Sequence, residues 1–215
     1  GHVNITSYNR MVLITGEVPA EADRVAVEQA IARIENVRST VNDLAVNVKG
    51  DLYFTDTANK KIWLLPKGGS PRVVDEGIES PNGVLFSPDQ TLLYVSDYVG
   101  QLSWVFQIQP DGSLTHKQKY FYAHMPDAAT RSSSDGMAVD ADGRVYIATA
   151  LGVQVFDQIG KCHAIIPAPQ RLALSNVEFN EKKRLIMMKS ATTGRSFFNL
   201  GMARKFMQTM LVGDA

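Results

Sequence analysis

The feature that most constrains the fold is a pattern that recurs along the middle of the chain. A polar residue opens a short apolar stretch, a turn containing Gly or Asp follows, and a second apolar stretch comes next. The polar residues, called anchors below, are Asn42, Asn82, Asp135 and Asn176, with separations of 40, 53 and 41 residues. A period of about 40 to 50 residues with several strands per unit is typical of β-propeller blades. The pattern therefore predicts antiparallel sheets that bury their faces against one another.

The anchors predict a shared site as well as a shared fold. Each anchor stands where the innermost strand of a blade would begin, so its side-chain oxygen would point toward the propeller axis. Several such oxygens would line a cavity that suits a hard divalent cation. The alternative is that Asn and Asp only form turns before strands. The sequence leaves both interpretations open.

Residues 42–177 resemble about half of a six-bladed propeller of the SMP-30/gluconolactonase/LRE-like family. The resemblance rests on NDLAVNVKGDLYFTD, SPNGVLFSPDQTLLYVSD and SDGMAVDADGRVYIATALGVQVFD. It implies hydrolysis of a small ester such as a sugar lactone, with a divalent metal, Ca²⁺, Zn²⁺ or Mn²⁺, in the channel. It also implies that Asn82 binds the metal, that Asp135 binds the metal and acts as general base, and that Asn42 contacts substrate or metal-bound water.

Two departures from the family pattern define the alternative. The metal-binding Glu of the family's first blade has no counterpart, and about three blades cannot close a ring of six. Open sheet edges favour association with other chains, so we expect self-association through these edges. The alternative function is a non-enzymatic composite or designed scaffold with no active site.

Residues 1–46 predict a small α/β unit. Alternation predicts a strand over Val3–Tyr8 and a second strand from Met11. Pro19 opens a predicted helix, and a strand-like stretch covers Val37–Val46. Residues 3–46 resemble a BON domain, carried by ITSYNRMVLITGEVP and AEADRVAVEQAIARIENV, which would imply an association with phospholipid surfaces.

Residues 178–215 are predicted to be a basic tail with a helix over Leu200–Val212. Seven Lys and Arg against two acidic residues lie in 180–215. Residues 175–215 loosely resemble the topoisomerase VI A-subunit/Spo11-like region before the catalytic tyrosine, although no tyrosine follows Tyr146. Binding of an anionic surface or nucleic acid through this tail is a second alternative, but a solvated helix face explains most such clusters, and nucleic acid is not the expected partner. Motif overlaps at both joins suggest a stitched or engineered composite.

Composition excludes several classes of protein. The net charge is zero, so no global field attracts nucleic acid or membrane, and Cys162 is the one cysteine, so no intrachain disulfide forms. No apolar run is long enough for a membrane span, and the compartment is not assigned. Ser132–Ser134 is expected to be a flexible approach to Asp135. The predicted fold class is mainly β, with partial six-bladed-propeller-like antiparallel sheets, a small N-terminal α/β unit and a C-terminal helix.

Overall fold

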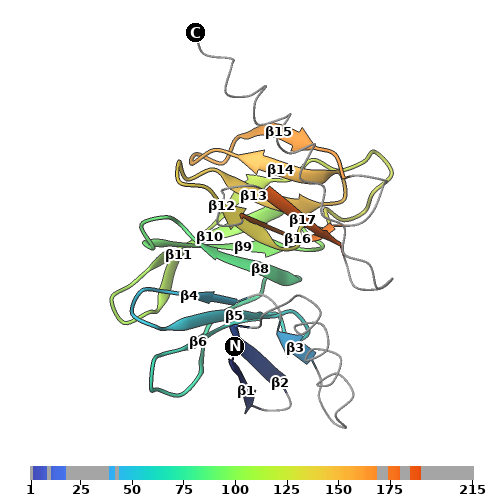
Figure 1. Ribbon diagram of the computed structural model, residues 1–215. Coiled ribbons are helices and arrows are strands. Elements are labelled where there is room, and N and C mark those ends of the chain that lie inside the picture. Colours follow the sequence, from blue (N-terminus) through green and yellow to red (C-terminus); the bar gives the residue numbers. More distant parts are fainter. Residues whose placement is uncertain are drawn as a thin grey trace. The chain divides into compact units, whose positions relative to one another are not determined.

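The computed structural model describes residues 2–8, 11–17, 39–41, 44–168, 174–179 and 185–189, and their regular secondary structure is entirely β-strand (Figure 1). The chain divides into two compact units, Gly1–Leu44 and Ala45–Ala215. The helices predicted from Pro19 and over Leu200–Val212 lie outside the described residues. Among the described residues, no helix is long and apolar enough to cross a membrane.

The first unit contains a three-stranded sheet. Strand β1 (His2–Tyr8) pairs antiparallel with β2 (Met11–Glu17), which confirms the two predicted strands. Strand β2 then pairs in parallel with β3 (Ser39–Val41). The single strand predicted over Val37–Val46 is divided, because β3 belongs to this sheet whereas β4 (Leu44–Val46) pairs in the next one.

The second unit contains three four-stranded antiparallel sheets, which we name blades A, B and C, and a two-stranded sheet that follows them. Each blade is a meander in which consecutive strands are neighbours. Blade A consists of β4, β5 (Leu52–Asp56), β6 (Lys61–Leu65) and β7 (Arg72–Glu76); blade B of β8 (Pro81–Phe86), β9 (Leu92–Asp97), β10 (Leu102–Ile108) and β11 (Leu114–Tyr122); blade C of β12 (Met137–Val139), β13 (Val145–Thr149), β14 (Gly152–Phe156) and β15 (Cys162–Ile166); and the last sheet of β16 (Leu174–Phe179) and β17 (Leu185–Lys189).

Turns with built-in acceptors join the first two strands of each blade. In blade A, the amides of Lys49 and Asp51 donate to Asn47 Oδ1 over 3.0 and 2.9 Å. In blade C, the amides of Asp142 and Arg144 donate to Asp140 Oδ1 over 3.0 and 2.9 Å. Side chains that accept from amides two or more residues ahead favour turns over continued strands. The motifs NVKGD and DADGR therefore end one strand and start the next.

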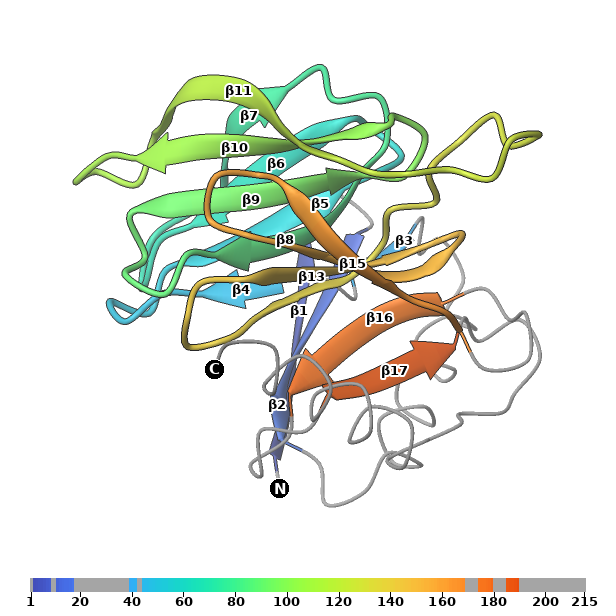
Figure 2. The ribbon, with the colours of Figure 1, turned by 90° about the horizontal axis from the view of Figure 1, so that it is seen from above.

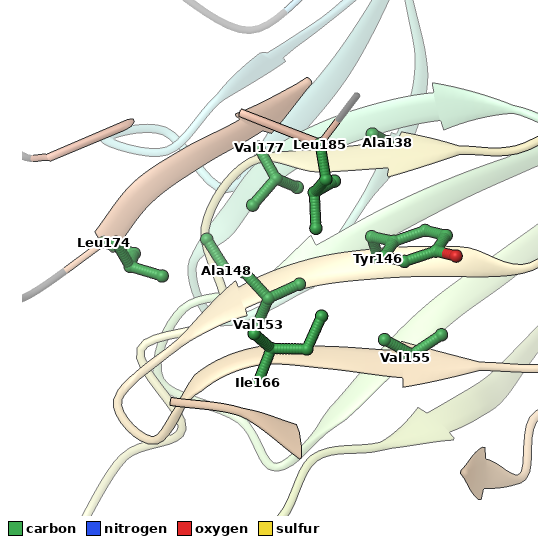
Figure 3. Close-up of a cluster of buried hydrophobic side chains, with 9 residues drawn as sticks. All are labelled: Ala138, Tyr146, Ala148, Val153, Val155, Ile166, Leu174, Val177 and Leu185. Atoms are coloured by element: carbon green, nitrogen blue, oxygen red, sulfur yellow. The ribbon is translucent and has the colours of Figure 1, made fainter. Parts of the chain in front are cut away.

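Three apolar cores join successive sheets, which Figure 2 shows following one another in chain order. Alternate residues of a strand face opposite sides, so the consecutive residues Tyr94 and Val95 enter two different cores. The core between blades A and B contains Tyr53, Ile62, Leu64, Ile78, Val84, Phe86, Leu93, Val95 and Phe106. The core between blades B and C contains Tyr94, Val105, Phe121, Met137, Val145, Ile147 and Phe156. The core between blade C and β16–β17 contains Ala138, Tyr146, Ala148, Val153, Val155, Ile166, Leu174, Val177 and Leu185 (Figure 3).

The β-structure continues past the predicted end of the propeller-like region. The sequence predicts a basic tail from residue 178, whereas β16 extends to Phe179 and pairs with β17. The physical reason is burial, since Val177 and Leu185 pack on blade C and are 2% and 3% exposed. The β-structure that packs on blade C therefore includes residues of the segment that was predicted to be a tail.

Candidate functional site

The structure places Asn82 and Asp135 at the starts of two neighbouring inner strands. Asn82 is the second residue of β8, Asp135 lies two residues before β12, and both side chains are half-buried. The hydroxyl of Ser96 connects the two segments. It accepts the amide of Gly83 over 2.7 Å and donates to the carbonyl oxygen of Asp135 over 2.8 Å. The backbone segments of two anchors that are 53 residues apart in the sequence are thus joined by the hydroxyl of one buried serine.

Glycines after the anchors allow the inner strands to approach one another. A Cβ atom on Gly83 would lie 2.4 Å from the carbonyl oxygen of Asp135, and one on Gly136 would lie 2.1 Å from Asn176 Oδ1. Both distances are far inside van der Waals contact. The glycines of the PNG and DGM motifs are therefore required by close approach, and the anchors Asn82, Asp135 and Asn176 follow one another from sheet to sheet.

A buried turn supports the entry to both strands. The carboxylate of Asp97, 5% exposed, accepts the amides of Ser80 and Gly100 over 3.1 and 3.0 Å. The hydroxyl of Ser132 donates to the carbonyl of Gly100 over 2.6 Å. Ser132 is fully buried, so this approach to Asp135 is fixed by hydrogen bonds rather than flexible as the serine run suggested. The run of three serines could not predict this hydrogen bond, because the partner of Ser132 lies 32 residues away in the sequence.

The predicted substrate contact and the predicted metal ligands differ in how far the structure describes them. Asn42 lies outside them, so its role near substrate stays a prediction. Among the residues that the structure describes, no group of three or more His, Cys, Asp or Glu side chains could hold a metal ion. The candidate donors are therefore the carboxylate of Asp135 and the amide oxygens of the other anchors.

Other reactive side chains take part in local structure. The Cys162 thiol is half-buried, and burial raises its pKa, which disfavours the nucleophilic thiolate. The neighbouring His163 ring bonds instead to Asp157 Oδ2 over 2.6 Å, and this bond lowers the pKa of the Asp157 carboxyl. These groups form no nucleophile–base pair.

A comparison with protein families matches residues 12–192 to the SMP-30/gluconolactonase/LRE-like region. The chain is 27% identical over 169 residues to a gluconolactonase of Zymomonas mobilis, a match that covers 70% of this chain and 48% of the relative. The chain thus spans about half the length of the curated relative. Neither the BON resemblance nor the topoisomerase resemblance gains support, nor does a composite origin, since the matched region begins at residue 12 and ends at residue 192.

Solved structures give the same fold. A gluconolactonase from Xanthomonas campestris is 29% identical with a TM-score of 0.60, over 70% of this chain and 54% of the other. The calcium-binding protein regucalcin from Agrobacterium tumefaciens is 20% identical with a TM-score of 0.60, over 72% and 55%. A luciferin-regenerating enzyme is 16% identical with a TM-score of 0.59, over 75% and 58%. Blades A to C therefore resemble part of a β-propeller.

Proposed function

This chain belongs to the SMP-30/gluconolactonase/LRE-like family, and from that premise we propose that it hydrolyses a small ester such as a sugar lactone. The observation that carries the proposal is that Asn82 and Asp135 stand at the starts of adjacent inner strands, where Ser96 bonds to the Gly83 amide and to the Asp135 carbonyl. A gluconolactonase that is 29% identical and shares the fold supports the substrate class.

The proposed reaction needs a base, an activated carbonyl and water. Asp135 would accept a proton from water as the water oxygen adds to the lactone carbonyl carbon. The ring C–O bond would then break, the ring oxygen would take a proton, and a hydroxy acid would leave. Asn82 would orient the reacting groups through its side-chain amide. We also propose that Asn42 contacts the substrate, as the family motif implies.

The donors fit a hard divalent cation. Carboxylate and amide oxygens are the ligands that Ca²⁺ prefers, and Ca²⁺ takes six to eight oxygens, several of which are commonly water. Asp135 and Asn82 would hold the ion together with water. When bound, the ion would polarise the lactone carbonyl and stabilise the developing negative charge. Zn²⁺ and Mn²⁺ are the other candidates from the family resemblance.

The test is hydrolysis of gluconolactone with added Ca²⁺, Zn²⁺ or Mn²⁺, followed by acid release and corrected for spontaneous hydrolysis. We expect metal-dependent turnover that Asp135→Asn lowers by about a hundredfold or more. Asp142→Asn is the matched control, because that carboxylate is exposed and lies in the turn between β12 and β13. Absence of turnover with all three metals, or equal rates in the two variants, would contradict the proposed hydrolase activity.

The alternative is a scaffold without an active site. It is favoured by the lack, among the described residues, of a group of three or more His, Cys, Asp or Glu side chains that could hold a metal ion. The scaffold predicts no saturable heat on titration with the three metals. Under either function we propose self-association through open sheet edges, because an edge strand offers unpaired N–H and C=O groups to another copy. Sedimentation of the chain as a monomer at every concentration would contradict this association.

A further inference from the structure

The second strand of each blade ends in a related tetrapeptide. The three are YFTD in β5, YVSD in β9 and YIAT in β13. The third position holds Thr55 in blade A, Ser96 in blade B and Ala148 in blade C. Two blades therefore carry a hydroxyl at this position and the third does not.

In blade B the hydroxyl reaches across to the next blade. Ser96 is fully buried. Its oxygen donates to the carbonyl of Asp135 in the approach to blade C, and it accepts the Gly83 amide within its own blade. The Asp135 amide donates to the carbonyl of Ala148 over 2.9 Å. The backbone of Asp135 is thus held from both sides, by blade B through its carbonyl and by blade C through its amide.

In blade A the equivalent hydroxyl makes the equivalent bond. Thr55, 7% exposed, donates to the carbonyl of Asn82 at the start of blade B. Thr57 supports the same segment by donating to the carbonyl of Pro81. The same arrangement therefore occurs in two successive blades. Thr55 of blade A bonds to the backbone of Asn82, and Ser96 of blade B bonds to the backbone of Asp135.

We propose that Thr55 and Ser96 are positioning residues that fix the backbones of Asn82 and Asp135 so that their side chains can share one divalent cation. The inference rests on the proposed function, because it concerns the same pair of donors. Groups behind the ligands set ligand orientation, and their loss typically lowers metal affinity by about 10- to 100-fold. A carbonyl held by a buried hydroxyl cannot shift without leaving both groups unpaired.

The test compares metal affinities of six forms of the whole chain by calorimetric titration with Ca²⁺ and Mn²⁺. We expect Ser96→Ala and Thr55→Val to weaken binding about 10-fold or more. Thr55→Ser keeps the hydroxyl and should bind as the unaltered chain does. Ser87→Ala is the matched control, because Ser87 is a buried residue directly after β8 whose hydroxyl bonds to Asp89 and Leu92. Its loss should lower stability but not affinity.

The outcomes separate the inference from the function. Metal binding that disappears in Asp135→Ala but stays equal in Ser96→Ala and Thr55→Val would overturn the inference and leave the proposed function standing. No binding by the unaltered chain would overturn both. Equal weakening by Ser87→Ala would also overturn it, because the effect would then be general destabilisation. If Ser96→Ala fails to fold, the difference between Thr55→Val and Thr55→Ser decides the matter alone.

Discussion

Tyr53, Tyr94 and Tyr146 occupy the same position in three successive blades, and all three rings are buried. Burial raises the pKa of each hydroxyl to about 12, with nearby negative charge as a smaller cause. A folded-state pKa above the ordinary value of about 10 means that the unfolded chain loses its protons first. These tyrosines therefore stabilise the fold below about pH 10, and the contribution is lost as the pH rises toward 12.

Tyr53→Phe gives the first prediction. The Tyr53 hydroxyl donates to the carbonyl of Gly112 over 2.8 Å, so its removal should cost about 1 to 2 kcal/mol of unfolding free energy near neutral pH. Above about pH 10 the unaltered chain alone also loses stability through ionisation of this tyrosine on unfolding, by about 1.4 kcal/mol per pH unit. The difference between the two proteins should thus close near pH 11, as measured by urea unfolding.

Tyr122→Phe is the control for this prediction, because its ring is 50% exposed. Tyr122→Phe should change the free energy of unfolding little, both at neutral pH and near pH 11. A Tyr53→Phe deficit that stays constant from neutral to alkaline pH would contradict the assigned burial of the hydroxyl.

At the scale of elements, the approach of β8 to the segment before β12 depends on a missing side chain. Gly83→Ala would place Cβ 2.4 Å from the Asp135 carbonyl oxygen and 3.1 Å from Ser96 Oγ. Because backbone cannot yield as a side-chain end can, we expect a loss of about 1 to 3 kcal/mol, measured by chemical unfolding. Gly69→Ala is the control, since its nearest neighbour is Pro66 Cβ at 3.2 Å. A loss at Gly83 no larger than at Gly69 would contradict the close packing.

An ion pair joins the outer strands of blades A and B, and its lysine lies over an aromatic ring. Lys117 Nζ lies 2.6 Å from Asp75 Oδ2 and 4.9 Å from the Trp104 ring centre, and both charged side chains are mostly buried. We expect a coupling energy of about 1 kcal/mol from a double-mutant cycle of Lys117→Ala and Asp75→Ala.

Lys60 and Glu79 provide the comparison for this ion pair. Their charged atoms are also 2.6 Å apart, but the side chains are 49% and 64% exposed. Solvent screening should reduce their coupling to about 0.3 kcal/mol. Equal coupling in the two pairs would show that burial and the Trp104 ring add nothing.

Elements were predicted well where period and turn chemistry agreed. Apolar stretches and the NVKGD and DADGR turns predicted the first two strands of blades A and C, because both signals are local. The division of Val37–Val46 between two sheets was not predictable, since strand pairing is not encoded in the residues of one strand. The pairing of β16 with β17, which extends to Lys189, was not predicted, because the charged residues near Lys182 indicated a tail instead.

At the scale of the whole molecule, the anchors mark segments that lie side by side, but they do not predict the bonds that hold those segments. Repeat spacing predicted that Asn82 and Asp135 occupy equivalent positions, and the structure brings their segments together through Ser96. The hydroxyl bonds across blades pair residues 27 and 39 positions apart, and no local pattern reports such a contact. The roles of Asn42, Asn82 and Asp135 and the domain boundaries at residues 42–46 and 177–178 stay predictions.

Three cores in series predict cooperative unfolding of blades A to C with β16–β17. In stacked repeats, stability is approximately a sum of unit and interface contributions, so strong interfaces make neighbours unfold together. Both tryptophans, Trp63 and Trp104, lie in blades A and B, so their fluorescence reports on that end alone. A change at the far interface should nevertheless shift their transition.

Val153→Ala tests this coupling, because Val153 is fully buried in the core between blade C and β16–β17. The lost methyl groups should cost about 2 kcal/mol and lower the urea midpoint of tryptophan fluorescence with an unchanged slope. Ile159→Ala, at a side chain 80% exposed, should leave the midpoint in place. If Val153→Ala leaves the fluorescence transition unshifted while amide exchange in β14 accelerates, blade C opens independently. Asn82 and Asp135 would then belong to blades that unfold independently. A cation shared by the two side chains would require both blades to be folded at the same time.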